Sequence, residues 1–200
     1  MTSSYYESCR SDFWKRVFQQ EVDYLRRELA GCKNLLSVGC GPAIIEGMLG
    51  HYGFDVTGLD ISQEALNQAP DQVRTVLGSA EQTNIESSSF DAIIYVASLQ
   101  FIDNYSEALR ESERILRPGG TILVMLLNPE SFFFKQKRRD PESYVNKIRH
   151  VNLKAIEQAI SQIFALEKTE YFLGIRGPEL FKSADPAHSS LYCVKAKKRI

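Results

Sequence analysis

Asn34-Leu-Leu-Ser-Val-Gly-Cys-Gly-Pro-Ala43 is a short apolar run that ends in two closely spaced glycines. The apolar part predicts a buried parallel strand, and residues 43–51 predict the helix that follows it. Glycine lets the backbone pass close beneath a ligand, and the amino end of a helix offers free N–H groups to an anion. The stretch therefore predicts a strand, a ligand-binding loop and a helix in direct succession.

The same alternation continues along the chain. Further strands are predicted at 55–61, 73–78, 90–97 and 121–127, and further helices at 62–69 and 104–116. Ser62 is a typical N-cap for the first of these helices. The second ends at Arg117-Pro-Gly-Gly120, because proline and two glycines do not continue a helix. Strict alternation of strand and helix predicts an α/β, doubly wound, Rossmann-like fold.

The C-terminal part departs from this pattern. A helix at 153–163 precedes two strand-like segments, 164–173 and 190–196, joined by a turn-rich connection of 16 residues. That connection is too short for a convincing crossover helix, so the two strands are expected to pair as an antiparallel hairpin at the far edge. The prediction is a mainly parallel seven-stranded sheet with this C-terminal hairpin and with helices on both faces.

The sequence predicts a single domain over 1–200 in four parts. An amphipathic helix within 5–30 makes 1–33 an N-terminal cap. Residues 34–127 form the cofactor-binding core, and 128–152 form a polar, aromatic-rich insertion or lid over the substrate. Residues 153–200 supply the last helix and the hairpin.

Composition narrows the class of protein. The 200 residues are 44% hydrophobic and 24% charged, with a formal net charge of -1 and a pI near 6.3. These values exclude a collagen-like, disordered or coiled-coil chain and disfavour nucleic-acid binding by bulk charge. The chain shows neither a membrane-length apolar run nor a signal-peptide pattern. A soluble, cytoplasmic protein is expected.

No metal site is predicted. The four cysteines show no C-x-x-C spacing and have no histidine at a zinc-ligand interval, so free buried thiols are expected. The residues concerned are Cys9, Cys32, Cys40 and Cys193, with histidines at 51, 150 and 188.

Asp60 ends the second predicted strand, 21 residues after Gly39. In nucleotide-binding folds of this type an acidic residue at about this distance binds the ribose hydroxyls. A carboxylate suits two vicinal hydroxyls because it accepts a hydrogen bond from each. The pattern fits nicotinamide, flavin and adenosyl cofactors equally.

Five motifs in order sharpen this assignment: Val38-Gly-Cys-Gly-Pro-Ala43, Thr57-Gly-Leu-Asp-Ile-Ser62, Gly78-Ser-Ala-Glu81, Ser89-Phe-Asp-Ala-Ile-Ile94 and Ala108 to Gly120. Together they resemble the class I S-adenosylmethionine-dependent methyltransferases, in particular the small-molecule, methyltransferase-11-like group. The resemblance covers about residues 34–127. It implies the fold already predicted, S-adenosylmethionine as cofactor, and methyl transfer to a small-molecule acceptor.

The resemblance also implies roles for single residues. It implies that Asp60 binds the ribose of the cofactor and that Ile61 packs on one face of the adenine. The adenine is also bordered by Ser79, Ala80 and Glu81, and the methionine part lies against Gly39, Cys40, Gly41, Val96 and Ala97. Ser98 and Gln100 are expected nearest to the transferable methyl. Tyr6 is a further candidate for the cofactor pocket.

Three positions depart from the family pattern. Ser37 stands where a carboxylate is common, so the cofactor's ammonium is expected to rest on backbone carbonyls and water. Ala43 replaces a glycine, which is tolerable if its φ is negative. Ser79 replaces a common aspartate, which weakens the expected partner of the adenine amino group.

A methyl on a sulfonium is already activated, so catalysis is expected to depend mainly on alignment and exclusion of water. The catalytic residues are not identified; the candidates are Ser98, Gln100 and His150. His150 would act as a general base, although an ordinary loop histidine is the simpler interpretation. Phenylalanines and cations in 131–139 either close over an acceptor or form a plain connection.

Two alternatives stay open. A nicotinamide-dependent oxidoreductase would share the glycine loop and Asp60, but Ile44 stands where its fingerprint requires glycine or alanine. The second alternative is a domain that binds or senses the adenosyl cofactor without catalysis. The chain lacks the Asn/Asp-Pro-Pro motif of base-amine methylation, so DNA is an unlikely substrate. Neither the acceptor nor the oligomeric state follows from the sequence.

Overall fold

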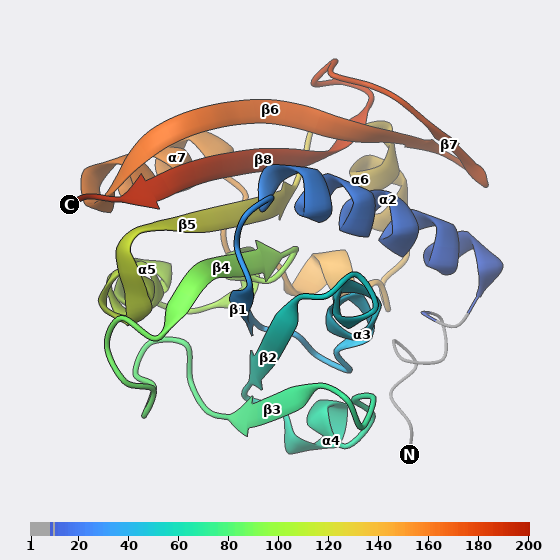
Figure 1. Ribbon diagram of the computed structural model, residues 1–200. Helices are drawn as coiled ribbons and strands as arrows, with labels where there is room; N and C mark the ends of the chain where they lie inside the picture. Colours follow the sequence, from blue (N-terminus) through green and yellow to red (C-terminus); the bar gives the residue numbers. More distant parts are fainter. Residues whose placement is uncertain (1–8, 10) are drawn as a thin grey trace.

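The computed structural model describes Cys9 and residues 11–200. One sheet of eight strands forms the middle layer, and helices cover both of its faces (Figure 1). The elements in chain order are α2 (Asp12–Glu28), β1 (Asn34–Val38), α3 (Ile44–Gly50), β2 (Asp55–Asp60), α4 (Gln63–Leu66), β3 (Arg74–Leu77), β4 (Phe90–Val96), η1 (Leu99–Phe101), α5 (Tyr105–Ile115), β5 (Leu116–Leu127), α6 (Phe132–Lys137), η2 (Tyr144–Lys147), α7 (Leu153–Ile163), β6 (Phe164–Arg176), β7 (Glu179–Phe181) and β8 (Ser189–Lys198).

The strand order is β3-β2-β1-β4-β5-β8-β6-β7. The first five of these strands are mutually parallel, as predicted. β8, the last strand of the chain, pairs antiparallel with both β5 and β6 and therefore lies between them. The predicted antiparallel pair of C-terminal strands is present. The order reverses between β1 and β4, which makes their carboxyl ends the topological switch point of the sheet.

The strand count corrects the prediction of seven. Residues 174–189 were expected to be only a turn-rich connection, but β6 extends to Arg176 and β7 pairs with it at the outer edge. The two-residue loop between them contains Gly177 with φ +56°, a left-handed conformation that suits a tight hairpin turn. Three residues are too short for alternation to mark a strand in the sequence.

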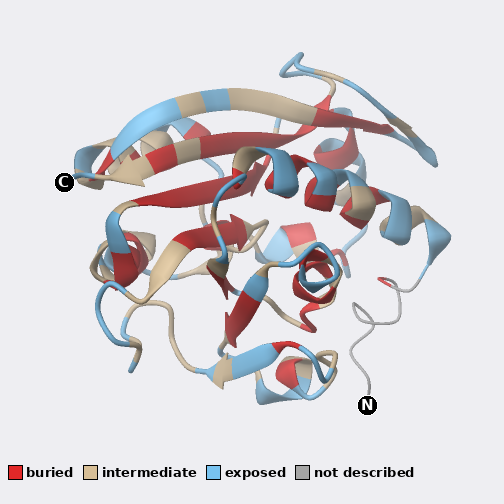
Figure 2. Ribbon diagram, viewed as in Figure 1, coloured by how far each residue is buried: buried red, intermediate tan, exposed pale blue. Residues whose placement is uncertain are grey.

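Two apolar cores lie on opposite faces of the sheet (Figure 2). In β4, Ala92 and Ile94 pack with α2, α3 and α6, whereas Ile93 and Tyr95 pack with α5 and α7. Successive side chains of a strand point to opposite faces, so this alternation lets one strand serve both cores. The fold thereby holds the carboxyl ends of the central strands in fixed positions.

Helix α2 lies within the predicted N-terminal cap and crosses one face of the sheet (Figure 1). Ser11 caps it by accepting a hydrogen bond from the Trp14 N–H. Its buried face includes Val17, Phe18 and also Glu21. Within the described part of the chain, no helix is long and apolar enough to cross a membrane.

Candidate functional site

A cavity of about 590 Å³ opens at the carboxyl ends of β1, β2 and β4. One part of its wall consists of the segments that follow β1, β2, β3 and β4. The other part consists of side chains from α2, α6, η2, β6 and β8. The cavity lies at the topological switch point, where open α/β sheets bind their ligands.

Gly39 permits the closest backbone approach in this cavity wall. Its φ is +71°, and a Cβ added there would lie 2.6 Å from the Ser98 Cβ. Ser98 Oγ in turn donates to the Val38 carbonyl at 2.5 Å. Only glycine lets the loop after β1 and the end of β4 meet in this way.

Asp60 joins the glycine loop to the end of β2. The Gly41 N–H donates to Asp60 Oδ2 at 2.7 Å, and the Ser62 N–H donates to Asp60 Oδ1 at 2.9 Å. Each carboxylate oxygen keeps a second lone pair, and the residue lines the cavity. Ile61 beside it is 78% exposed, which leaves an apolar side chain free to cover a flat ring.

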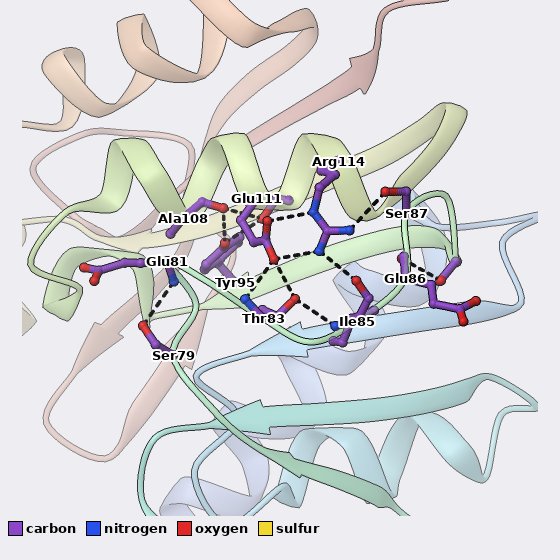
Figure 3. Close-up of polar contacts among 12 residues, drawn as sticks. Ser79, Glu81, Thr83, Ile85, Glu86, Ser87, Tyr95, Ala108, Glu111 and Arg114 are labelled. Atoms are coloured by element: carbon purple, nitrogen blue, oxygen red, sulfur yellow. Dashed lines mark hydrogen bonds and ion pairs between the residues drawn. The ribbon is translucent and has the colours of Figure 1, made fainter.

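Ser79, Ala80 and Glu81 line the cavity on the other side of Asp60. Ser79 Oγ accepts from the Glu81 N–H, and Glu81 Oε1 accepts from the Asn104 N–H at 2.8 Å. These residues belong to the connection from β3 to β4, which α5 holds in place (Figure 3).

Glu111 of α5 is the anchor of that connection. It accepts hydrogen bonds from the Thr83 N–H and hydroxyl and from the Arg114 guanidinium (Figure 3). Arg114 also donates to the Ile85 carbonyl at 2.7 Å. The hydrogen bond from Arg114 is the largest influence on the Glu111 pKa, which it lowers to about 2. The segment that carries Ser79 to Glu81 is therefore attached to α5 through an ion pair that stays charged at neutral pH.

Val96, Ala97 and Ser98 line the cavity, but Gln100 and His150 do not. Gln100 is fully buried: its amide donates to the carbonyls of Leu127 and His150 and accepts from the Leu127 N–H. His150 Nε2 lies 2.9 Å from the Ile102 carbonyl oxygen, and its ring packs on Tyr105. Of the three catalytic candidates, the structure places only Ser98 on the cavity wall.

Two buried carboxylates on the wall were not predicted. Ser37 Oγ donates to Glu46 Oε1 at 2.5 Å. Glu46 is 2% exposed, and burial is the main reason that its pKa rises to about 7, against the opposing effect of Ser37. A carboxylate therefore does stand beside Ser37, supplied by α3 instead of β1. The available signal was that Glu46 is the only acidic residue in the helix after the glycine loop.

Glu21 is the second such carboxylate. It is 6% exposed, and burial followed by repulsion from Glu46 raises its pKa to about 8. Trp14, Val17, Phe18 and Glu21 all line the cavity at i, i+3, i+4 and i+7 spacing, so they share one face of α2. A glutamate on the apolar face of an amphipathic helix was the signal in the sequence.

Comparison with known proteins agrees with this geometry. Residues 36–124 match the family model described as a methyltransferase domain. This match supports placing the chain among the class I S-adenosylmethionine-dependent methyltransferases. S-adenosylmethionine is the cofactor of this family, so the predicted family, fold class and cofactor are confirmed.

Individual relatives of this chain support the assignment. The bifunctional biotin-biosynthesis protein BioHC of Cellvibrio japonicus is 30% identical over 74% of this chain and 30% of its own length. The malonyl-[acyl-carrier protein] O-methyltransferase of Enterobacter lignolyticus is 29% identical over 66% of this chain and 56% of its own length. The chain thus matches little more than half, or less, of these curated relatives.

A solved structure confirms the fold. It is that of an S-adenosylmethionine-dependent methyltransferase, a possible histamine N-methyltransferase, from Thermotoga maritima, with a TM-score of 0.75 and 18% identity. The superposition covers 91% of this chain and 89% of that one. At this identity the likeness concerns the fold alone.

Two positions in the glycine loop of this chain have structural outcomes. Ala43 has φ +52°, so the condition of a negative φ is not met and the residue carries left-handed strain. Cys40 Sγ occupies the space over Gly58, where an added Cβ would lie 2.6 Å away. Burial raises the pKa of the Cys40 thiol well above its usual range, which agrees with a packing role.

Other predictions are placed as follows. Tyr6 lies outside the described residues. Of the aromatic run after β5, Phe133 and Phe134 are buried and Phe132 is half exposed, and Phe133 lines the cavity. The described residues contain no group of three side chains suited to hold a metal ion.

Proposed function

We propose that the protein transfers the methyl group of S-adenosylmethionine to a small-molecule acceptor. The observation that carries this proposal is Asp60, which lies on the cavity wall and is hydrogen-bonded to the glycine loop at the switch point of the sheet. Its free lone pairs suit a ribose diol, with Ile61 beside it for the adenine.

The remaining donors and acceptors fit the other parts of that cofactor. Ser79, Ala80 and Glu81 border the adenine position, and Gly39, Cys40, Gly41, Val96 and Ala97 border the methionine position. We assign the cofactor's ammonium to Glu46, because a buried carboxylate next to the loop is the strongest partner there for a cation. This replaces the expectation that backbone carbonyls and water bind it.

When bound, the cofactor supplies an activated methyl on a sulfonium. The protein then has to align the acceptor with that methyl and keep water away. The segment 128–152 contributes Phe133 and Tyr144 to the wall, and α2 contributes Trp14 and Phe18. We propose that these side chains form the acceptor half of the cavity.

Calorimetric titration with S-adenosylhomocysteine and S-adenosylmethionine, with NADH as the control, tests the cofactor. Micromolar binding of the adenosyl ligands with none of NADH is expected. Release of S-adenosylhomocysteine during incubation with an acceptor panel then tests catalysis. Tight NADH binding would contradict the proposal, and cofactor binding without turnover on any acceptor would favour a non-catalytic binding domain.

A further inference from the structure

We infer that the methyl acceptor carries a protonated amine, and that Glu21 binds this amine inside an aromatic chamber of the cavity. The inference rests on the proposed function, since it names the class of acceptor for the same site. It follows from three features: a buried carboxylate and a buried hydroxyl group that have no hydrogen-bond partner among the described residues, and the aromatic rings around the carboxylate.

Glu21 differs from Glu46 in its surroundings. The Glu46 carboxylate accepts a hydrogen bond from Ser37, whereas the Glu21 carboxylate makes no hydrogen bond or ion pair with the described residues. Glu21 is 6% exposed and lines the cavity. A buried carboxylate without a partner is unfavourable unless it is neutral or meets a cation. Because the described residues supply no such cation, we expect a ligand in the cavity to supply it.

Among the described residues, the titratable groups that face Glu21 do not include a cation. They are Glu46 of α3, Tyr144 of η2 and Cys193 of β8. Lys147 and Arg149 line the same cavity, but Lys147 is exposed and Arg149 is paired with Asp103. In the described part of the cavity wall, the buried ionisable groups are therefore acids, and the two cations belong to exposed residues.

Aromatic rings form the wall next to Glu21. Trp14 packs against Phe18 at a centroid distance of 5.7 Å, against Phe133 at 6.2 Å and against Tyr144 at 6.4 Å. All four line the cavity. Aromatic faces attract cations, and they also contact an apolar body. This combination suits an amine attached to a flat or branched hydrocarbon group.

Ser190 is an independent sign of a ligand. It is 1% exposed and lines the cavity, and its hydroxyl has no hydrogen-bond partner among the described residues. Buried hydroxyl groups in folded proteins nearly always have a partner. Ser190 follows the first residue of β8, close to the carboxyl end of β5, where it can meet a polar group of the acceptor.

The same carboxylate suits the proton transfer that amine methylation needs. A protonated amine has no free lone pair, so it first gives one proton to Glu21. The nitrogen lone pair then forms the N–C bond while the C–S bond breaks, and the sulfur keeps that electron pair as a neutral thioether. The methylated amine leaves as a cation, and Glu21 returns its proton to water. A Glu21 pKa of about 8 is suited to this exchange near neutral pH.

The test compares three variants of the whole chain. Glu21→Gln and Glu46→Gln each remove one buried charge, and Glu86→Gln removes an exposed one from a loop outside the cavity. The probes are a series of arylalkylamines, each with the alcohol and the carboxylate of the same carbon skeleton. Calorimetry measures their binding with and without S-adenosylhomocysteine.

An amine is expected to bind the wild-type chain at least ten times more tightly than its alcohol and its carboxylate. Glu21→Gln should abolish this preference and leave S-adenosylhomocysteine binding within about twofold. Glu46→Gln should weaken the binding of S-adenosylhomocysteine. Glu86→Gln should change neither the amine preference nor the binding of S-adenosylhomocysteine. Amine affinity should rise about tenfold between pH 6.5 and 8, because Glu21 must be ionised to bind the ammonium.

The inference is overturned if every amine fails to bind, if alcohols or carboxylates bind as well as amines, or if Glu21→Gln keeps the preference. Failure of the wild-type chain to bind S-adenosylhomocysteine would instead overturn the proposed function. The amine preference is still measured in that case, from the titrations without S-adenosylhomocysteine. The two failures are therefore distinguishable.

Discussion

The two halves of the cavity are built in different ways. The half that fits the adenosyl group consists of the loops after β1, β2 and β3, and it depends on backbone geometry at Gly39 and on Asp60. The other half consists of side chains from α2, α6, η2, β6 and β8. Proteins that share a fold share the geometry of its strand ends, and this half can therefore keep binding the same ligand. Side chains from separate elements vary between such proteins, so they can select the second ligand.

The largest expected effect lies in the backbone-built half. Gly39→Ala adds a Cβ 2.6 Å from the Ser98 Cβ at a left-handed φ. Strain and displacement should together cost about 3 kcal/mol, roughly a hundredfold in S-adenosylhomocysteine affinity. Gly50→Ala is the matched control, since its added Cβ meets no atom within 4 Å. Equal binding by both variants in calorimetry would show that this half does not depend on backbone geometry.

Asp60→Ala tests the same half of the cavity. It removes the acceptor of the Gly41 N–H and the proposed ribose ligand, and binding of S-adenosylhomocysteine should weaken by ~1.5–3 kcal/mol. Asp55→Ala at the start of the same strand is the control, because its ion pair with Arg74 is half exposed. Unchanged affinity in Asp60→Ala would place the ribose elsewhere.

The side-chain-built half is tested by the pH dependence of stability. The pKa values of Glu21 and Glu46 are raised to about 8 and about 7. Between pH 4.5 and 8 the folded chain therefore holds protons that the unfolded chain has lost, and the free energy of unfolding falls as pH rises.

This decline should reach ~2–3 kcal/mol between pH 6.5 and 8 in urea titrations without ligand. The double variant Glu21→Gln, Glu46→Gln should show a much flatter dependence over the same range. Equal slopes for the wild-type chain and the double variant would mean that these carboxylates are solvated in the folded protein.

The smallest expected effect concerns the anchor of the β3–β4 connection. Glu111→Gln removes the charge that binds Arg114 and Thr83 and should lower the free energy of unfolding by ~1–2 kcal/mol at pH 7. Because the Glu111 pKa is lowered to about 2, its contribution is complete above pH 4.5 and is lost as pH falls towards 2. Glu107→Gln, which removes a half-exposed pair with Arg110, is the control in urea titrations and should change stability little.

Sequence patterns predicted most of the fold because each signal lay within one element or one turn. Alternating apolar runs located the parallel strands, and Ser62 and Arg117-Pro-Gly-Gly120 located helix ends. The short β7 was missed because three residues carry no periodicity. Gln100 was expected near the methyl and His150 was a candidate base, but both side chains bind backbone carbonyls and neither lines the cavity.

What the sequence determined by itself was the class of fold, the glycine loop and Asp60, because these depend on local backbone requirements. Only the tertiary structure decided that Glu46 of α3 lies beside Ser37, and that Glu21, Trp14 and Ser190 share one cavity. These residues belong to α2, α3 and β8, and they lie up to 176 positions apart in the chain. Packing of separate elements against one sheet, which no local pattern encodes, brings them together.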